Sequence, residues 1–200
     1  MMINNLPINN PVVIGIVGGM GSGKTLTATA ISYILRDSYT IISNYSLKHS
    51  DIVYKNLDDL MDFQKTIQGI ENDKLIIHDE IHIFNDSRNA MSNRNMLFSY
   101  ILTQFRKMHV TFLYTTQYLN QVDIRIRNNT DVILQPNYND ELDVLEIKYF
   151  IRNTFGQLGF TLSHTKMFNN IKPMFNQYNT DELIGVDNIQ KLGDKMDSNS

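Results

Sequence analysis

Residues 18–25 of this chain read Gly18-Gly19-Met20-Gly21-Ser22-Gly23-Lys24-Thr25, a glycine-rich run that ends in lysine and threonine. The apolar residues 12–17 before it predict a buried strand, and residues 25–35 after it predict a helix. A glycine-rich turn between a strand and a helix lets backbone N–H groups surround an anion, and the helix dipole adds positive charge at the same end. The stretch therefore predicts a phosphate-binding loop (Walker A) and a nucleoside triphosphate site.

Two side chains of this loop have expected roles of their own. Lys24 is expected to reach the β and γ phosphates, and the Thr25 hydroxyl is expected to bind Mg²⁺. The other residues of the loop are expected to line the nucleotide; they are Gly18, Gly19, Met20, Gly21, Ser22 and Gly23. ATP and Mg²⁺ are therefore the expected cofactors.

A second motif completes a hydrolysis site. The apolar residues 75–77 are followed by His78 and then by the acidic pair Asp79-Glu80, which is the Walker B pattern. Asp79 is expected at the carboxyl end of a strand beside the phosphate loop, where ligands of open α/β sheets bind. There it would hold Mg²⁺ through water, and Glu80 would act as the general base on the attacking water. His78 is expected to point away from Asp79 into the core.

Further candidates follow from the next strand. Residues 110–114 predict a core strand that runs into Thr115-Thr116-Gln117, and Gln117 is a candidate to sense the γ-phosphate or orient water. Phosphoryl transfer also gains from an arginine, often supplied by a neighbouring subunit. Arg106 is the favoured arginine, with Arg125 and Arg127 as alternatives, and all three are expected near the catalytic edge of the sheet.

The pattern of elements predicts an α/β fold with a mostly parallel sheet covered by helices on both faces. A loose arm is expected over residues 1–10, one domain over 11–186 and a polar tail over 187–200. Strands are expected near 12–17, 40–43, 74–78, 110–114, 131–134, 144–153 and 160–164, the last ones more antiparallel and peripheral. Helices are expected near 25–35, 56–63, from 92 to about 108, and 124–128.

Composition excludes several classes of protein. The chain has 200 residues, 42% of them hydrophobic, with no cysteine and a formal net charge of −3. Disulfides and cysteine-ligated zinc are therefore excluded, and any contact with DNA must use a local basic patch rather than a globally basic surface. No run approaches the ~18 apolar residues of a membrane-spanning helix. The first ten residues lack the basic-then-apolar pattern of a signal peptide.

The order of these motifs resembles the FtsK–HerA superfamily of nucleic-acid-pumping ATPases. It is most similar to the branch that holds viral genome-packaging ATPases and zonula-occludens-toxin-like proteins. The resemblance rests on Walker A, Walker B, the arginine before the Gln117 strand, the stretch 122–127 and a Tyr-x-Thr segment at 178–180. It implies a P-loop NTPase core of the RecA/ASCE type, a Walker B role for Asp79 and Glu80, and a sensor role for Gln117.

The resemblance also implies what the site drives. The expected function is an ATP-hydrolysing motor that moves double-stranded DNA, most readily a viral genome-packaging ATPase. Expected partners are other copies of the chain in a ring, because an arginine acting in trans needs a neighbour, and a capsid or portal-vertex protein. The expected location is the host cytoplasm, or the virion.

Three rival interpretations stay open on the sequence. The first is a secretion, extrusion or conjugation ATPase of a phage or mobile element, which would need a membrane partner. The second is a nucleotide kinase, against which the acidic pair Asp79-Glu80 argues. The third is a nucleotide-dependent switch without catalysis, which steady turnover of ATP would exclude.

Overall fold

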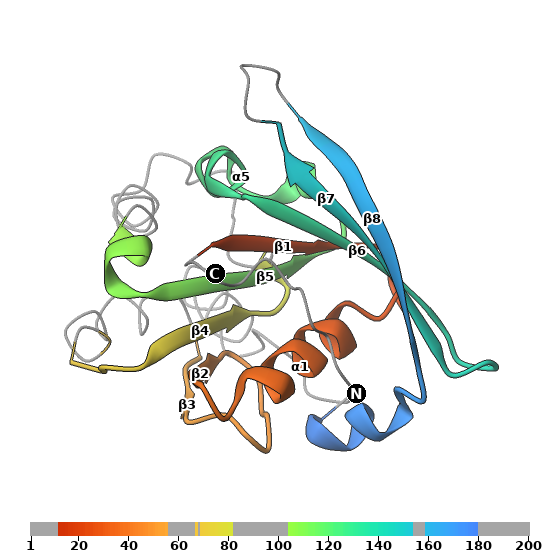
Figure 1. The fold of residues 1–200 in the computed structure, drawn as a ribbon, viewed down its shortest axis with the longest axis horizontal. Coiled ribbons are helices and arrows are strands. Elements are labelled where there is room, and N and C mark those ends of the chain that lie inside the picture. Colours follow the sequence, from red (N-terminus) through yellow and green to blue (C-terminus); the bar gives the residue numbers. More distant parts are fainter. Residues whose placement is uncertain (1–11, 56–66, 68, 82–103, 154–158, 180–200) are drawn as a thin grey trace, which may run out of the picture.

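The computed structural model describes residues 12–55, 67, 69–81, 104–153 and 159–179, and the statements below concern these residues (Figure 1). Several expectations fall outside them: the N-terminal arm, the helix near 56–63, most of the helix from residue 92, and the C-terminal tail. The side chain of Arg106 is also outside the described part of the chain, although its backbone is inside it.

Among the described elements, α1 lies between β1 and β2, α5 lies between β5 and β6, and the last three strands form an antiparallel meander. The strands are β1 (Val13–Val17), β2 (Tyr39–Ser43), β3 (Ile52–Val53), β4 (Asp73–His78), β5 (Val110–Thr116), β6 (Val132–Asn139), β7 (Val144–Arg152) and β8 (Phe160–Asn169). The α-helices are α1 (Lys24–Leu35) and α5 (Ile124–Asn129), and the 3₁₀ helices are η3 (Arg106–Met108), η4 (Leu119–Gln121) and η5 (Lys172–Gln177).

All eight strands join one sheet in the order β3-β2-β4-β5-β1-β6-β7-β8. The pairs from β3 through to β6 are parallel, whereas β6–β7 and β7–β8 are antiparallel. This confirms the predicted α/β class with a mostly parallel sheet and antiparallel strands toward the C-terminus. Because β5 lies between β1 and β4, the ends of three parallel strands meet at the edge where the phosphate loop begins.

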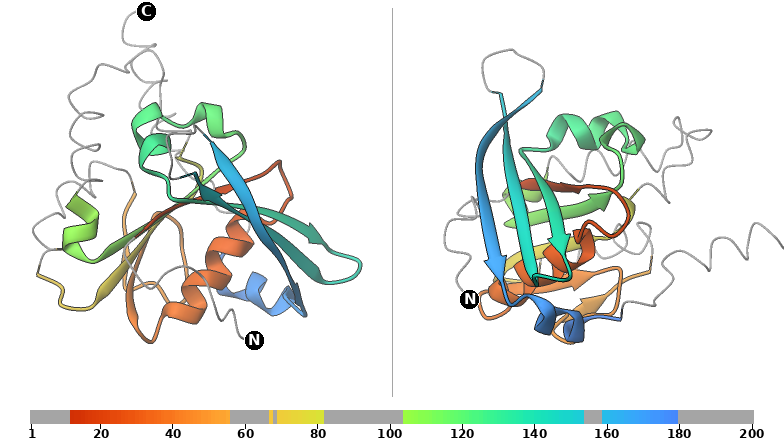
Figure 2. Two further views of the ribbon diagram at one scale, coloured as in Figure 1. Left: turned by 45° about the horizontal axis from the view of Figure 1, so that its top comes forward. Right: turned by 90° about the vertical axis from the view of Figure 1, so that its right-hand side faces the viewer.

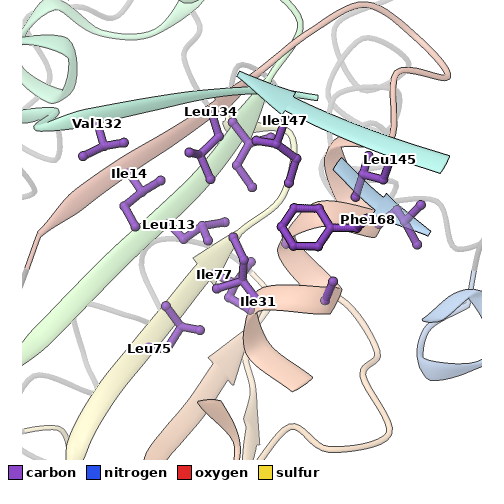
Figure 3. Close-up of a cluster of buried hydrophobic side chains, with 14 of the residues drawn as sticks. Ile14, Ile31, Leu75, Ile77, Leu113, Val132, Leu134, Leu145, Ile147 and Phe168 are labelled. Atoms are coloured by element: carbon purple, nitrogen blue, oxygen red, sulfur yellow. The ribbon is translucent and has the colours of Figure 1, made fainter. Parts of the chain in front are cut away.

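Each face of the parallel sheet carries its own buried cluster, and a helix packs on each. Ile14 and Ile16 of β1 point to the α1 face, where Ile31 packs (Figure 3), while Val13 points to the opposite face with Ile126 of α5. Figure 2 shows α1 and α5 on opposite sides of the sheet. Strands buried on both faces explain why the sequence has nearly continuous apolar runs there.

A close approach inside the sheet requires glycine in β1. A Cβ built on Gly15 would lie 2.7 Å from the hydroxyl oxygen of Tyr114 and 2.9 Å from Cδ1 of Ile133. The Tyr114 hydroxyl in turn bonds Oγ1 of Thr130 at 2.8 Å. A large aromatic side chain of β5 therefore fills the space that a β1 side chain would take, and it links β5 to the residue after α5.

We expect Leu113→Ala to lower the free energy of unfolding by about 2–5 kcal/mol, because it leaves a cavity between the sheet and α1. Leu113 is 0% exposed. Leu142→Ala is the matched control, since Leu142 is 71% exposed and its truncation should change stability by less than about 0.5 kcal/mol. Urea unfolding followed by circular dichroism measures both, and equal effects would contradict the assigned core.

Candidate nucleotide-binding site

The run 18–23 forms a loop between β1 and α1, and α1 begins at Lys24. Gly21 and Gly23 have φ values of 73° and 90°. These are left-handed conformations that glycine adopts without steric cost, so the sequence turns tightly here before the helix starts. The N–H groups of the first helical turn then face the open end of the loop, which is the arrangement that binds anions.

Neighbouring groups hold this loop in place. The Gly18 N–H donates to the Thr116 carbonyl at 3.2 Å, and the Tyr138 N–H donates to the Ser22 carbonyl at 3.1 Å. Nζ of Lys24 donates to the Gly19 carbonyl at 2.9 Å across the loop. The loop is therefore attached to β5 on one side and to the end of β6 on the other.

The phosphate loop and the acidic pair are in direct contact in the structure. Oγ1 of Thr25 donates to Oδ2 of Asp79 at 2.9 Å, although the two residues are 54 positions apart. Asp79 immediately follows β4 and is buried, with 3% of its surface exposed. The two oxygen-bearing residues expected at the metal position thus lie side by side.

Thr115 at the end of β5 holds both acidic residues. Its Oγ1 donates to Oδ1 of Asp79 at 2.5 Å and accepts the N–H of Glu80 at 2.8 Å. This hydroxyl reaches β4 because β5 pairs directly with it, Tyr114 lying opposite His78. The polar end of this strand is visible in the sequence, but no local pattern separates Thr115 from the other two threonines of β5, Thr111 and Thr116.

Asn44, which follows β2, fixes Asp79 from the other side. Its Nδ2 donates to the Asp79 carbonyl at 3.0 Å, and its Oδ1 accepts the Asp79 N–H at 2.7 Å. One buried side chain therefore satisfies both backbone groups of Asp79. Its position after a strand marks Asn44 as a residue that could face the site, but asparagine is common throughout this chain and the partner of Asn44 lies 35 residues away.

Glu80 has a positive φ of 54°, which is uncommon for a residue with a side chain. Glu80 and Gln117 both line an open cleft of about 250 Å³ together with Lys24 and Thr25. The full lining is Met20, Gly21, Gly23, Lys24, Thr25, Leu26, Glu80, Gln117, Tyr138, Phe175 and Tyr178. The candidate residues from the loop, from β4 and from β5 are thus gathered on one cleft.

Burial and charge act on the site in opposite directions. Burial raises the pKa of Asp79, while the hydroxyls of Thr115 and Thr25 act to lower it. Burial lowers the pKa of Lys24, against the pull of the Asp79 and Glu80 carboxylates. A desolvated carboxylate beside a threonine hydroxyl suits Mg²⁺, which is bound through one or two such oxygens together with phosphates and water. Among the described residues there is no cluster of three or more acidic, histidine or cysteine ligands.

His78 faces the core, as the strand alternation predicts. Its Nδ1 bonds the Tyr54 hydroxyl at 2.8 Å, and that hydroxyl lies 2.9 Å from the Ile77 carbonyl. Burial lowers the pKa of His78 to about 3, so the ring is neutral at pH 7. The residue supports β4 from the face opposite α1 and does not line the cleft.

Of the three arginine candidates, Arg125 and Arg127 have described side chains, and both lie outside the cleft of their own chain. Nε of Arg125 pairs with Asp123 at 3.2 Å, and the Arg127 carbonyl accepts a hydrogen bond from Arg152. Neither residue lines the cleft. Arg106 lies in η3, before β5, whereas Gln117 follows the other end of that strand. The expectation that Arg106 lies near the catalytic edge is therefore wrong for its own chain, because β5 separates the two positions.

Comparison with known proteins identifies the family. The sequence profile of the ATPase family associated with various cellular activities (AAA) matches residues 14–138, which span the loop, β4 and β5. No curated protein matches the sequence. In the described part of the chain, no helix combines the length and the apolar character needed to cross a membrane.

Solved structures with a similar fold include three P-loop proteins. The N-terminal domain of zonular occludens toxin from Neisseria meningitidis superimposes with a TM-score of 0.56 at 14% identity, covering 85% of this chain and 100% of that one. The genome packaging NTPase B204 of Sulfolobus turreted icosahedral virus 2, in complex with ATP-gammaS, gives 0.52 at 12% identity over 76% and 97%.

EssC (ATPases 2 and 3) from Geobacillus thermodenitrificans gives a TM-score of 0.54 at 12% identity, covering 92% of this chain and 43% of that one. At these identities the likeness shows the fold. The predicted resemblance to P-loop ATPases of the packaging and zonula-occludens-toxin type is confirmed at that level.

We expect Thr115→Val to lower the free energy of unfolding by about 1.5–3 kcal/mol, because the isosteric side chain leaves a buried carboxylate and a backbone N–H without this partner. Thr115→Ser keeps the hydroxyl and should retain most of the stability. Chemical denaturation of the two variants provides the comparison. A loss in the serine variant as large as that in the valine variant would mean that the methyl group, not the hydroxyl, matters.

Proposed function

The chain belongs to the ATPase family associated with various cellular activities, and on this premise we propose that it is an ATP-hydrolysing motor that moves double-stranded DNA. The observation that carries the ATPase part is the network in which Thr25 and Thr115 both donate to the buried Asp79 carboxylate. These hydrogen bonds join the phosphate loop and the end of β5 to the acidic pair. A phosphate loop without such a partner would support binding alone.

The residues divide into those that bind and those that act on water. The loop N–H groups and Lys24 hold the phosphates at the start of α1. Thr25 and Asp79 would hold Mg²⁺, which would neutralise charge on the phosphates when bound. Glu80 accepts the proton of the attacking water, and Gln117 orients that water. Both side chains line the same cleft as Lys24.

Movement of DNA is the finer part of the proposal. The similar fold of a viral packaging NTPase supports it. A ring of identical subunits supplies an arginine in trans, with Arg106 favoured and Arg125 or Arg127 as alternatives. We place the motor in viral genome packaging, in the host cytoplasm or on the virion, acting with a capsid or portal-vertex protein. The similar fold of the toxin domain, which has the higher TM-score, keeps extrusion of a phage as the second use of the same core.

We expect Glu80→Gln to slow steady ATP hydrolysis by about 10²- to 10⁴-fold while ATP still binds, because the amide cannot accept the proton of water. Glu71→Gln, at an exposed residue outside the cleft, is the matched control and should hydrolyse ATP normally. Phosphate release and calorimetric ATP binding measure the two steps. Normal turnover in the Glu80 variant would remove Glu80 from the mechanism.

We expect hydrolysis per subunit to rise with protein concentration and with added double-stranded DNA, because the complete site needs a neighbour. Arg106→Ala subunits should bind ATP, hydrolyse it roughly 10³-fold more slowly, and inhibit wild-type subunits when mixed with them. Arg36→Ala, at an exposed arginine after α1, is the control. If Arg125→Ala or Arg127→Ala has this effect instead, that residue is the trans-acting arginine, and the proposal of a ring is retained.

Turnover that is independent of both concentration and DNA would contradict the motor. DNA-stimulated turnover together with capture of a capsid or portal-vertex protein favours packaging. Stimulation by membrane components of a phage favours extrusion. If the protein binds ATP but does not hydrolyse it under any of these conditions, the result favours a non-catalytic switch.

A further inference from the structure

Three aromatic side chains line the cleft beyond the phosphate loop, and none of them has a role in the proposed hydrolysis. They are Tyr138 at the end of β6, Phe175 in η5, and Tyr178 just after η5, and together they are called the aromatic wall. All three are half-buried, so each still presents ring surface. The cleft is continuous from Lys24 and Thr25 to this wall.

Tyr138 is fixed relative to the phosphate loop. Its backbone N–H donates to the Ser22 carbonyl at 3.1 Å, and a Cβ built on Gly23 would lie 3.0 Å from the Tyr138 Cβ. The ring therefore starts where the loop turns into α1. Phe175 continues the wall, with its ring centroid 5.4 Å from that of Tyr138 at an interplanar angle of 60°.

The η5 segment is attached at both ends. Oδ1 of Asp143, in the β6–β7 turn, accepts the N–H groups of Ile171 at 3.0 Å and Lys172 at 2.9 Å. At the other end, the Lys48 N–H donates to the Gln177 carbonyl at 2.9 Å. These bonds hold η5 alongside α1, as Figure 1 shows.

Tyr178 extends the wall toward the acidic pair. Its ring lies 6.1 Å from Phe175 and packs edge-on against Tyr45 at 6.2 Å. Burial, and secondarily the Asp79 carboxylate, raise the pKa of Tyr178 to about 12, so its hydroxyl stays protonated. The wall thus runs along the cleft as a row of aromatic side chains that β6 and η5 hold in place.

We propose that the aromatic wall is the seat of the nucleobase, which it holds by stacking. A ligand whose phosphates lie on the loop must place its base in the same cleft, and half-exposed aromatic rings are the surface on which bases stack. The charged and amide groups of the lining, Lys24, Glu80 and Gln117, stand with the phosphate site. Stacking tolerates any base, so ATP and GTP bind with similar affinity. This inference rests on the proposed nucleotide site.

The test compares ligands that share phosphates but differ in the base. Binding of ATP, GTP and inorganic tripolyphosphate, each with Mg²⁺, is measured by calorimetry on the full chain. In Phe175→Ala the affinity for ATP and GTP should fall about tenfold, while tripolyphosphate binds as before. Phe175→Tyr should keep nucleotide affinity. Phe160→Ala, at a half-buried phenylalanine far from the cleft, is the matched control and should change nothing.

A direct readout is available because the chain has no tryptophan. Phe175→Trp introduces a single indole, whose fluorescence should be quenched by ATP and GTP but not by tripolyphosphate. If Phe175→Ala lowers the affinity for all three ligands equally, η5 only supports the loop. If the variant binds nucleotides as the wild type does, the aromatic wall does not bind the base. Either result overturns the inference. Strong preference of the wild type for one nucleotide would overturn the stacking-only part.

Lys24→Ala separates this inference from the proposed function. It should weaken all three ligands, tripolyphosphate included, because the lysine contacts phosphate. If Lys24→Ala leaves every affinity intact, the proposed site itself fails. If only the Phe175 variants disagree with expectation, the ATPase proposal stands and the base lies elsewhere.

Discussion

A buried carboxylate that must be satisfied organises this molecule. Asp79 is almost wholly removed from water, and a buried charge is costly unless hydrogen bonds or cations compensate it. Thr25 and Thr115 donate to its two oxygens, and Asn44 takes both of its backbone groups. These partners come from α1, from β5 and from the end of β2. The position of one side chain therefore fixes the relative position of most of the parallel sheet's carboxyl edge.

The strand order makes this arrangement available. If β4 followed β1 directly in the sheet, Thr115 could not stand between the loop and the acidic pair. The insertion of β5 lets one hydroxyl contact Asp79 and the Glu80 N–H while the neighbouring Thr116 carbonyl accepts from Gly18. The same insertion puts Gln117 on the cleft. The carboxyl end of β5 thus carries both the groups that hold the phosphate loop and the residue proposed to orient water.

Sequence reasoning located the elements whose burial leaves an apolar run, and it found the loop because its glycines and lysine are local. It stopped β5 at residue 114, since Thr115 and Thr116 are polar, although both are buried in the strand. It ended β6 at 134, before Pro136; past Leu134 that strand pairs with β7 alone, where proline is tolerated. The contacts of Thr115 and Asn44 with Asp79, and the aromatic wall, were not predicted because they join residues dozens of positions apart, which no local pattern encodes.

A backbone hydrogen bond connects the phosphate loop to the antiparallel part of the sheet. The Tyr138 N–H donates to the Ser22 carbonyl and joins the phosphate loop to β6. β6 pairs with β7 over its whole length, and β7 pairs with β8 with one register shift between Tyr149 and Phe150. These strands twist away from the parallel part of the sheet (Figures 1 and 2). The phosphate loop is therefore joined, bond by bond, to a hydrogen-bonded ribbon that reaches the last strand of the sheet.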